Sequence, residues 1–352
     1  MLHVTLGWLR THSSVPVEFS PGIGKRQLLP GHQDEISIAI PSDPYKTIDT
    51  STWEVSDIEP SGAEIKRVLI DPIDPTVRWF FKNNTTDEQM RYGEDFAEVI
   101  SSHLAPILGV ASAQVHFATH RGVEGIISKN VAPLGLELVH GATWMPAHGI
   151  PNFKRGEKFR KGHSLTNIHK SLVGVAAPPS NFYPQDLTAF DAFAGMCVFD
   201  AWISNQDRHE DNWAVLNPII KRNDLIMRLS PIYDNGSSLA FNENEAKMSE
   251  MLNDSKNPRI QQWGRRAKAQ RMERIQPGNR RLKLVEVAGM ALGMCTEAGR
   301  EHWKSQIAAV DLDQARGIAH EITIMSDVRR NFINKLLTLN LERIRNVCLS
   351  AA

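Results

Sequence analysis

The front of the chain carries short runs of β-branched and aromatic residues, with one helical segment among them. Residues 65–70 and 77–82 flank the turn sequence DPIDPT and predict two strands joined by a turn. Apolar residues recur at helical spacing from about 87 to 108, and Gly109 ends the segment. Three further strand-like runs are 113–118, 123–129 and 136–140. This order predicts a small sheet with one helix within residues 61–145.

The rear of the chain is dominated by helical patterns. A helix is predicted from Asp186 to about Ser204, with its apolar residues on one face. Two short strand-like runs follow at 212–216 and 225–229. Helical patterns beyond residue 240 occupy 283–298, 312–325 and 327–348. We therefore expect an α+β fold, with a β-rich front half, a helical rear half and a cleft between them.

Composition narrows the class of protein without naming a function. The chain has 352 residues, of which 41% are hydrophobic, and this is enough for a packed core. Its 40 basic and 40 acidic residues balance, which excludes a generally polycationic binder of nucleic acid or membranes. No apolar run has the length of a membrane span, and the first residues lack the pattern of a secretory signal. Three scattered cysteines favour a reducing, cytoplasmic setting; they are Cys197, Cys295 and Cys348.

Two polar clusters lie where apolar elements end. The first, NQDRHEDNW at 205–213, follows the predicted 186–204 helix. The second, YDNGSS at 233–238, follows the 225–229 strand. Loops that rigid elements hold in place are common positions for catalytic groups.

These clusters contain the residue types that phosphoryl transfer requires. The reaction needs hard oxygen ligands for Mg²⁺ at the nucleotide phosphates and a carboxylate that orients or deprotonates the acceptor hydroxyl. Asp207, Asn212 and Asp234 supply one base and two metal ligands in a suitable order.

A lysine on a strand of the first half, balanced by a carboxylate on a helix, would hold the α- and β-phosphates. Lys82 ends the second predicted strand. The helix after it carries Glu94 and Glu98 one turn apart, and the pattern alone leaves both open as its partner, with Glu94 favoured.

The sequence resembles the HipA-like protein kinases over roughly residues 64–300. The similarity lies in DRHEDN with the later YDNGSS, in GEDFAEVISSHLAPILGV, and in GIISKNVAPLGLELVHGATW. The same order of Asp and Asn occurs in the phosphatidylinositol kinases, and N-x-D-R-x-x-x-N-W with D-N-G is similar to the type II 4-kinases.

The resemblance implies a bilobal protein-kinase-like fold and a role for each matching residue. On this fold residues 1–60 are an N-terminal extension of unknown role, 61–147 the N-lobe with the hinge, and 148–352 the C-lobe. Asp207 would be the catalytic base, and His209 would steady its loop or the γ-phosphate.

The remaining implied roles concern the nucleotide and its metal. Asn212 and Asp234 would bind Mg²⁺, and Lys82 with Glu94 would hold the phosphates of ATP. Backbone groups of the hinge near Leu138 and Val139 would meet the adenine. One part of the pattern is missing, because the turn before Lys82 has no glycine and we identify no Gly-rich phosphate loop.

The resemblance implies an ATP- and Mg²⁺-dependent transfer of the γ-phosphoryl group to a Ser or Thr hydroxyl of a protein. In toxin–antitoxin relatives the substrate is a translation-related protein and the partner an antitoxin. Two alternatives remain open: a phosphatidylinositol-kinase-like lipid kinase, and a non-catalytic nucleotide-binding interaction protein, which the missing Gly-rich loop would favour.

A basic run at 259–283 has two interpretations. It is either a solvated, mobile loop or a docking patch for an acidic or RNA-bearing partner, since clustered Arg and Lys attract phosphates. Glu273 is the one acidic residue among its nine basic ones: Arg259, Arg265, Arg266, Lys268, Arg271, Arg274, Arg280, Arg281 and Lys283.

Overall fold

The computed structural model describes most of the chain from residue 43 onward. The described ranges are 43–59, 66–84, 93–150, 153–220, 226–254, 259–275 and 277–349. The start of the predicted N-terminal extension and the opening Asp87 and Glu88 of the first predicted helix lie outside these ranges.

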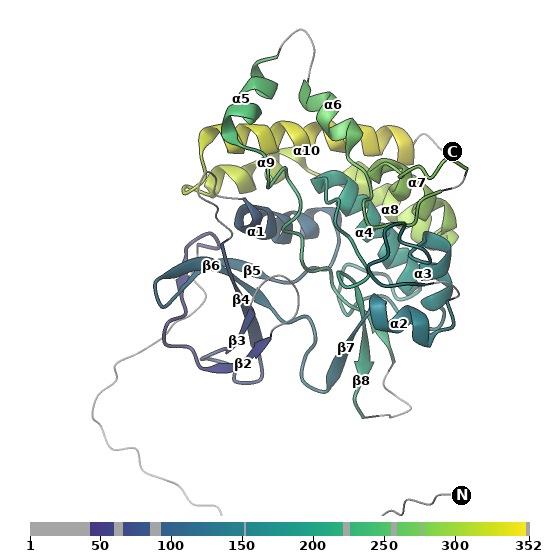
Figure 1. Ribbon diagram of the computed structural model, residues 1–352, viewed down its shortest axis with the longest axis horizontal. Helices are drawn as coiled ribbons and strands as arrows, with labels where there is room; N and C mark the ends of the chain where they lie inside the picture. Colours follow the sequence, from purple (N-terminus) through teal and green to yellow (C-terminus); the bar gives the residue numbers. More distant parts are fainter. Residues whose placement is uncertain are drawn as a thin grey trace, which may run out of the picture. The chain divides into compact units, whose positions relative to one another are not determined.

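The N-lobe is a six-stranded sheet with one helix (Figure 1). Its strands follow the order β1-β5-β6-β4-β3-β2, in which β1 and β5 are parallel and the other neighbours antiparallel. The strands are β1 (Ile48–Asp49), β2 (Val55–Glu59), β3 (Lys66–Ile70), β4 (Arg78–Asn83), β5 (Val115–His120) and β6 (Val123–Lys129). Helix α1 (Glu94–Leu104) continues into a 3₁₀ turn, η1 (Ala105–Leu108), and packs against β5, β6 and the C-lobe.

Two features of the sheet differ from the predicted layout. Strands β1 and β2 fall within residues 1–60, which we placed in an extension, yet they pair with β5 and β3. They were not recognised because β1 has only two residues and β2, VSDIE, is short and polar.

The last predicted strand of the N-lobe belongs to another sheet. β7 (Leu136–His140) pairs with β8 (Ala214–Pro218), which pairs with β9 (Arg228–Leu229). The prediction of one sheet for all the strands before residue 145 was therefore wrong. Alternation of apolar residues identifies a strand but does not specify its partner. In this position β7 connects the N-lobe to the C-lobe.

The C-lobe is mainly helical, as expected from the sequence. Its helices are α2 (Gly141–Ala147), α3 (Leu165–Ser171), α4 (Ala189–Ile203), α5 (Glu245–Asn253), α6 (Arg259–Arg266), α7 (Leu284–Met294), α8 (Glu297–Ala309), α9 (Leu312–Glu321) and α10 (Asp327–Cys348). Helix α10 runs along the far side of the C-lobe from the sheet (Figure 1) and packs against α4, α5 and α7.

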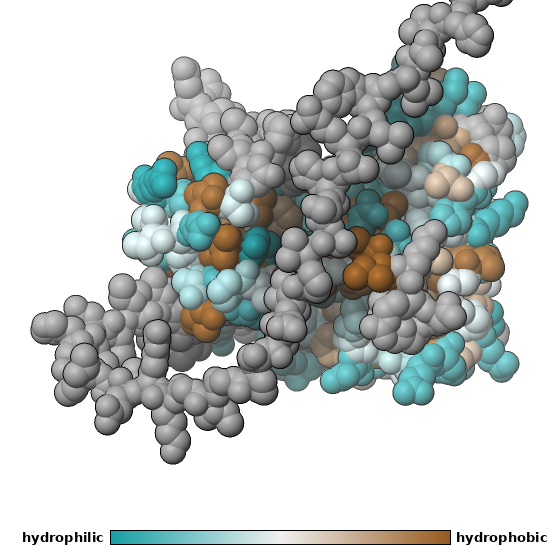
Figure 2. Space-filling view, turned by 90° about the horizontal axis from the view of Figure 1, so that it is seen from below, coloured by the Kyte–Doolittle hydropathy of each residue, from teal (hydrophilic) through white to brown (hydrophobic). Residues whose placement is uncertain are grey.

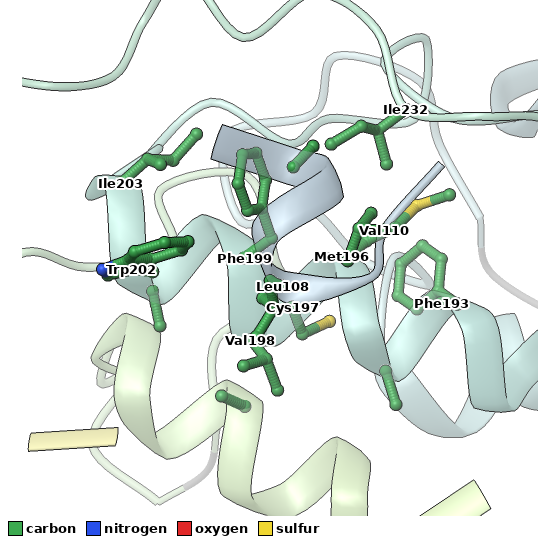
Figure 3. Close-up of a cluster of buried hydrophobic side chains, with 14 of the residues drawn as sticks. Leu108, Val110, Phe193, Met196, Cys197, Val198, Phe199, Trp202, Ile203 and Ile232 are labelled. Atoms are coloured by element: carbon green, nitrogen blue, oxygen red, sulfur yellow. The ribbon is translucent and has the colours of Figure 1, made fainter. Parts of the chain in front are cut away.

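Helix α4 is the centre of the C-lobe core. Every one of its residues is buried, so it is covered on all sides rather than on one face as predicted. Thr188 and Asp191 form a reciprocal capping box at its start, and Ser204 ends it in a left-handed conformation. Figure 3 shows side chains of α4 packed with Leu108 and Val110, which follow α1, and with Ile232, which follows β9; the labelled residues of α4 are Phe193, Met196, Cys197, Val198, Phe199, Trp202 and Ile203.

Candidate active site

A cleft of about 520 Å³ lies between the two lobes and brings the predicted site residues together. The N-lobe contributes side chains from β4 and α1, and the C-lobe contributes the loops after α4 and after β9. The predicted residues that line it are Lys82, Glu94, Asp207, His209, Asn212 and Asp234. Lys66 at the start of β3 also lines it, and sequence reasoning did not identify this residue.

Lys82 is held between the lobes by two carboxylates. Its Nζ atom lies 2.8 Å from Oδ1 of Asp234 and 3.1 Å from Oε1 of Glu98. The favoured pairing with Glu94 was therefore wrong, although Glu94 lines the same cleft. The two glutamates share a helix face, but Glu98 lies one turn further along and is buried, with 4% of its side chain exposed.

The charges of this triad are mutually stabilised. Burial alone would lower the pKa of Lys82, but Asp234 and Glu98 raise it well above its usual value. Burial alone would raise the pKa of the Asp234 carboxyl, but the ammonium of Lys82 holds it well below its usual range. Both groups are therefore charged at neutral pH.

The loop after α4 is ordered by its own side chains. The backbone N–H of Asp207 donates to Oδ1 of Asn205 at 3.1 Å, and Nδ2 of Asn205 donates to Oδ1 of Asp200 at 2.9 Å. Nδ2 of Asn212 donates to the carbonyl oxygen of Asp207 at 3.0 Å. Asp207 and Asn212 are thus fixed relative to each other.

Arg208 is a central organising residue that sequence reasoning missed. Its buried guanidinium forms a bidentate ion pair with Asp200, with N–O distances of 2.8 and 3.1 Å. It also donates to the carbonyl oxygens of Asn212 and Tyr233, at 2.8 and 2.9 Å, and to Oδ1 of Asn235 at 2.7 Å. Burial tends to lower the pKa of Arg208, but Asp200 raises it above its usual value. Arg208 therefore joins the two predicted catalytic loops.

The loop after β9, which carries Asp234, is fixed by its backbone conformation and by a hydrogen bond to α1. Asp234 has a φ of 59°, a conformation that Asp adopts more readily than most residues. The next backbone N–H, that of Asn235, donates to Oε2 of Glu98 at 3.0 Å. Glu98 thereby binds Lys82 with one oxygen and the Asp234 loop with the other.

His209 lies beside Asp207 and is neutral at pH 7. Its Nδ1 atom accepts a hydrogen bond from the backbone N–H of Asp211 at 3.1 Å, so the proton is on Nε2. That Nε2 atom lies 3.8 Å from Oδ2 of Asp207. Burial lowers the pKa of His209 although Asp207 and Asp211 oppose the change. A role in steadying the loop stays a prediction.

The predicted hinge residues lie on β7, next to the cleft. Leu138 and Val139 do not line it, whereas the neighbouring His140 does. β7 is the edge strand of its sheet, because β8 lies between it and β9. The backbone groups along its other edge therefore do not pair with β8 and could bind the adenine. The adenine contact of Leu138 and Val139 stays a prediction.

Arg271 contacts the predicted base, and sequence reasoning did not identify this contact. Its Nε donates to Oδ1 of Asp207. The basic run that contains it is partly helix α6 and partly a segment against the loop after α4, where the N–H of Gln270 donates to the carbonyl oxygen of Gln206 at 3.2 Å. The interpretation of this run as a solvated loop is wrong for Arg271.

The donor set fits a hard divalent cation. Asp234 keeps 35% of its side chain exposed, and Asn212 uses its NH₂ group for Asp207, which leaves its amide oxygen as a ligand. Both residues line the same cleft. One carboxylate and one amide oxygen, completed by phosphates and water, suit Mg²⁺.

The chain has a β-rich N-lobe with one helix, a mainly helical C-lobe and a polar cleft between them. This arrangement is the fold class of the bilobal kinases. A family model for the HipA-like C-terminal domain matches residues 58–290, so the chain belongs to this family. The predicted family and the α+β fold class are thereby confirmed.

A solved structure agrees with the fold. The chain is similar to the Helicobacter pylori proinflammatory kinase CtkA, with a TM-score of 0.65 and 17% identity over 87% of this chain and 100% of that one. It also aligns with HipA in the Shewanella oneidensis MR-1 HipA–HipB–operator DNA complex, with a TM-score of 0.48 and 12% identity over 84% and 66% of the two chains. No curated protein sequence matches this chain.

On the face shown in Figure 2, the described residues carry hydrophobic side chains in small groups among hydrophilic ones. Among the most exposed large ones are Leu134, Ile219 and Ile220, near the ends of β7 and β8. Within the described ranges no helix is long and apolar enough to cross a membrane.

Proposed function

We propose that this protein is an ATP- and Mg²⁺-dependent kinase that transfers a phosphoryl group to a Ser or Thr hydroxyl of a protein. The observation that carries the proposal is the Lys82–Glu98–Asp234 triad beside Asp207 and Asn212 in one cleft. Phosphoryl transfer depends on positioning and on charge stabilisation, and this arrangement provides both.

The residues of the site have distinct roles in the proposed reaction. Lys82 carries a fixed positive charge that binds the α- and β-phosphates, and Glu98 keeps its ammonium in place. Asp207 accepts the hydrogen bond of the acceptor hydroxyl and receives its proton as the hydroxyl oxygen bonds to the γ-phosphorus and the bond from that phosphorus to the leaving ADP breaks. Arg208 holds the loops of Asp207 and Asp234 at a fixed separation.

Asn212 and Asp234 would hold the metal ion. Bound there, Mg²⁺ would neutralise charge on the phosphates during transfer. Lys82 occupies only Oδ1 of Asp234 in the hydrogen bonds of the structure, so this ion pair and metal binding by Oδ2 are compatible.

A protein acceptor is favoured over a lipid. The resemblance of DRHEDN and YDNGSS to the HipA-like protein kinases, together with family membership, supports this choice. The Shewanella complex contains HipA together with HipB, and an antitoxin-type partner and a translation-related substrate stay predictions for this chain. A cytoplasmic location also stays a prediction.

A labelling experiment tests the proposed function. The purified protein is incubated with Mg²⁺ and γ-labelled ATP alone, with cell lysate, and with phosphoinositide vesicles. We expect Mg²⁺-dependent label on Ser or Thr of protein. Label in lipid alone would support the lipid kinase instead, and no label in any sample would support a non-catalytic nucleotide-binding protein.

A further inference from the structure

A second cavity adjoins the nucleotide cleft at the predicted base. Its volume is about 470 Å³, and Asp207 and Ser237 line both cavities. A group bound in the second cavity is therefore next to the point at which the acceptor hydroxyl must meet the nucleotide. This position suits the side chain that neighbours the acceptor residue in a substrate.

The lining of this second cavity is strongly cationic. Asp207 is the one carboxylate among the described residues that line it, and it is already paired with Arg271. The cationic side chains are Lys158, Arg160, Arg271 and Arg281. Two segments far apart in sequence supply them, one with Lys158 and Arg160 and the other with Arg271 and Arg281, so the fold brings these charges together.

Of the three arginines in this lining, Arg281 is the one without an ion-pair partner among the described residues, since Arg160 lies near Glu210 and Arg271 pairs with Asp207. The Nε atom of Arg281 is buried and has no hydrogen-bond partner within the described part of the chain. A buried donor without a partner is unfavourable, and an anionic ligand would satisfy it. By contrast, NH1 of Arg160 lies 3.9 Å from Oε1 of the buried Glu210, which offsets part of its charge.

The position of Arg271 is set by a buried histidine. Nδ1 of His163 donates to the carbonyl oxygen of Arg271 at 2.7 Å, and Nε2 of His163 accepts from Nε1 of Trp213 at 3.1 Å. The backbone N–H of Glu273 donates to the carbonyl oxygen of His163 at 2.8 Å. This side of the second cavity is therefore preformed.

We propose that the second cavity binds an anionic side chain of the acceptor protein, a carboxylate or a phosphorylated residue, beside the hydroxyl that is phosphorylated. Arg281 is its principal contact, and Lys158 and Arg160 add to the field. That the bound protein is a phosphorylation substrate rests on the proposed kinase activity. The binding of an anion rests only on the cavity and its cationic lining.

A peptide is favoured over RNA or a membrane because the cations converge on one cavity instead of following an extended surface. Two other arginines of the basic run, Arg259 and Arg280, form ion pairs away from this cavity. Arg259 pairs with Asp254 at 3.0 Å, and Arg280 pairs with Glu286 at 2.8 Å. The run therefore does not present one continuous basic stripe, which a nucleic-acid backbone would require.

Binding of synthetic peptides to the full chain tests the proposal without requiring catalysis. Short fluorescein-labelled peptides share a central Ser and differ only in its neighbours, which are Ala, Asp, phosphoserine or Lys. Fluorescence anisotropy at low salt gives the affinities, and γ-labelled ATP in parallel samples gives transfer. Arg281→Ala is compared with Arg280→Ala, which removes the adjacent arginine that pairs with Glu286 and does not line the second cavity.

We expect the Asp or phosphoserine peptide to bind the wild-type protein about tenfold more tightly than the Ala peptide, since the contact is a charge-assisted hydrogen bond. Arg281→Ala should lose most of this preference, Arg280→Ala should keep it, and Arg281→Glu should favour the Lys peptide. The affinities of the Asp and phosphoserine peptides, compared with each other, show whether the second cavity prefers a carboxylate or a phosphate.

Equal affinity for the Ala and Asp peptides, or an unchanged preference in Arg281→Ala, would overturn the proposal. Tighter binding of a single-stranded oligouridylate or of phosphoinositide vesicles than of any peptide, lost in Arg281→Ala, would assign the second cavity to RNA or lipid instead. Selective peptide binding with no transfer of label would refute the kinase activity and leave the anion pocket standing.

Discussion

The Nζ atom of Lys82 lies 2.8 Å from Oδ1 of Asp234, although 152 residues separate them in the sequence. This contact joins a strand of the N-lobe to a loop of the C-lobe. Glu98 strengthens it, because one of its oxygens binds Lys82 and the other accepts the N–H of Asn235. The three side chains therefore tie the strand and helix of the N-lobe to the loop that carries the proposed metal ligand Asp234.

The first prediction concerns the choice between the two glutamates of α1. Glu98→Gln removes the charge that balances Lys82, and we expect kcat/KM for ATP to fall by about tenfold or more, since hydrogen bonds between charged groups are the strong ones. Glu94→Gln changes the same helix face one turn away and should have a clearly smaller effect. Steady-state kinetics at varied ATP measure both. Equal losses would refute the assignment of Glu98 as the partner.

The second prediction concerns Arg208 and stability. Arg208→Met leaves Asp200 buried without its ion-pair partner, and we expect a loss of about 3–5 kcal/mol in the free energy of unfolding. Arg316→Met breaks a more exposed pair with Asp313 on α9 and should cost less than about 1 kcal/mol. Urea denaturation of both variants gives the comparison. A small effect for Arg208→Met would show that other contacts hold the two loops.

The third prediction concerns acid stability. Burial lowers the pKa of His163 below 6.5, so the unfolded chain binds its proton more readily than the folded chain. The stability that neutral His163 contributes is therefore present above pH 6.5 and is lost as the pH falls below this value. For one proton the loss is at most about 1.4 kcal/mol per pH unit.

His163→Gln isolates this contribution from that of other buried histidines. The variant should be less stable at neutral pH, because it changes the hydrogen bonds to Arg271 and Trp213. Its free energy of unfolding should fall less steeply than that of the wild type on acidification below pH 6.5. Parallel curves for the two proteins would exclude His163 as a source of the acid sensitivity.

Much of the fold was readable from local patterns. The strand containing Lys82, the helix containing Glu98, and the helical C-lobe all follow from periodicity. The partner of β7 did not, because the alternation along a strand is the same for either neighbouring sheet. β1 and β2 were also missed, since strands so short or polar depend on tertiary pairing.

The part of the candidate site that the sequence predicted consists of residues whose order along the chain matches the order that phosphoryl transfer requires. Asp207, Asn212 and Asp234 lie together in the cleft as their spacing suggested. The contacts of Arg208 and Arg271 could not be predicted, because each joins segments whose proximity depends on the complete fold. Arg208 is, however, part of the D-R-H motif. Its position in a short polar loop between the apolar segments 186–204 and 212–216 was a signal that it could be buried.

The central claim is that Asp207 and Asp234 have separate roles in one phosphotransfer site. The most direct test is single-turnover transfer from γ-labelled ATP together with Mg²⁺-dependent nucleotide binding, measured for the wild type, Asp207→Asn and Asp234→Asn. We predict that Asp207→Asn binds MgATP as the wild type does but transfers no label. Asp234→Asn should lose the Mg²⁺ dependence of binding as well as transfer. Wild-type rates of transfer in either variant would contradict the account.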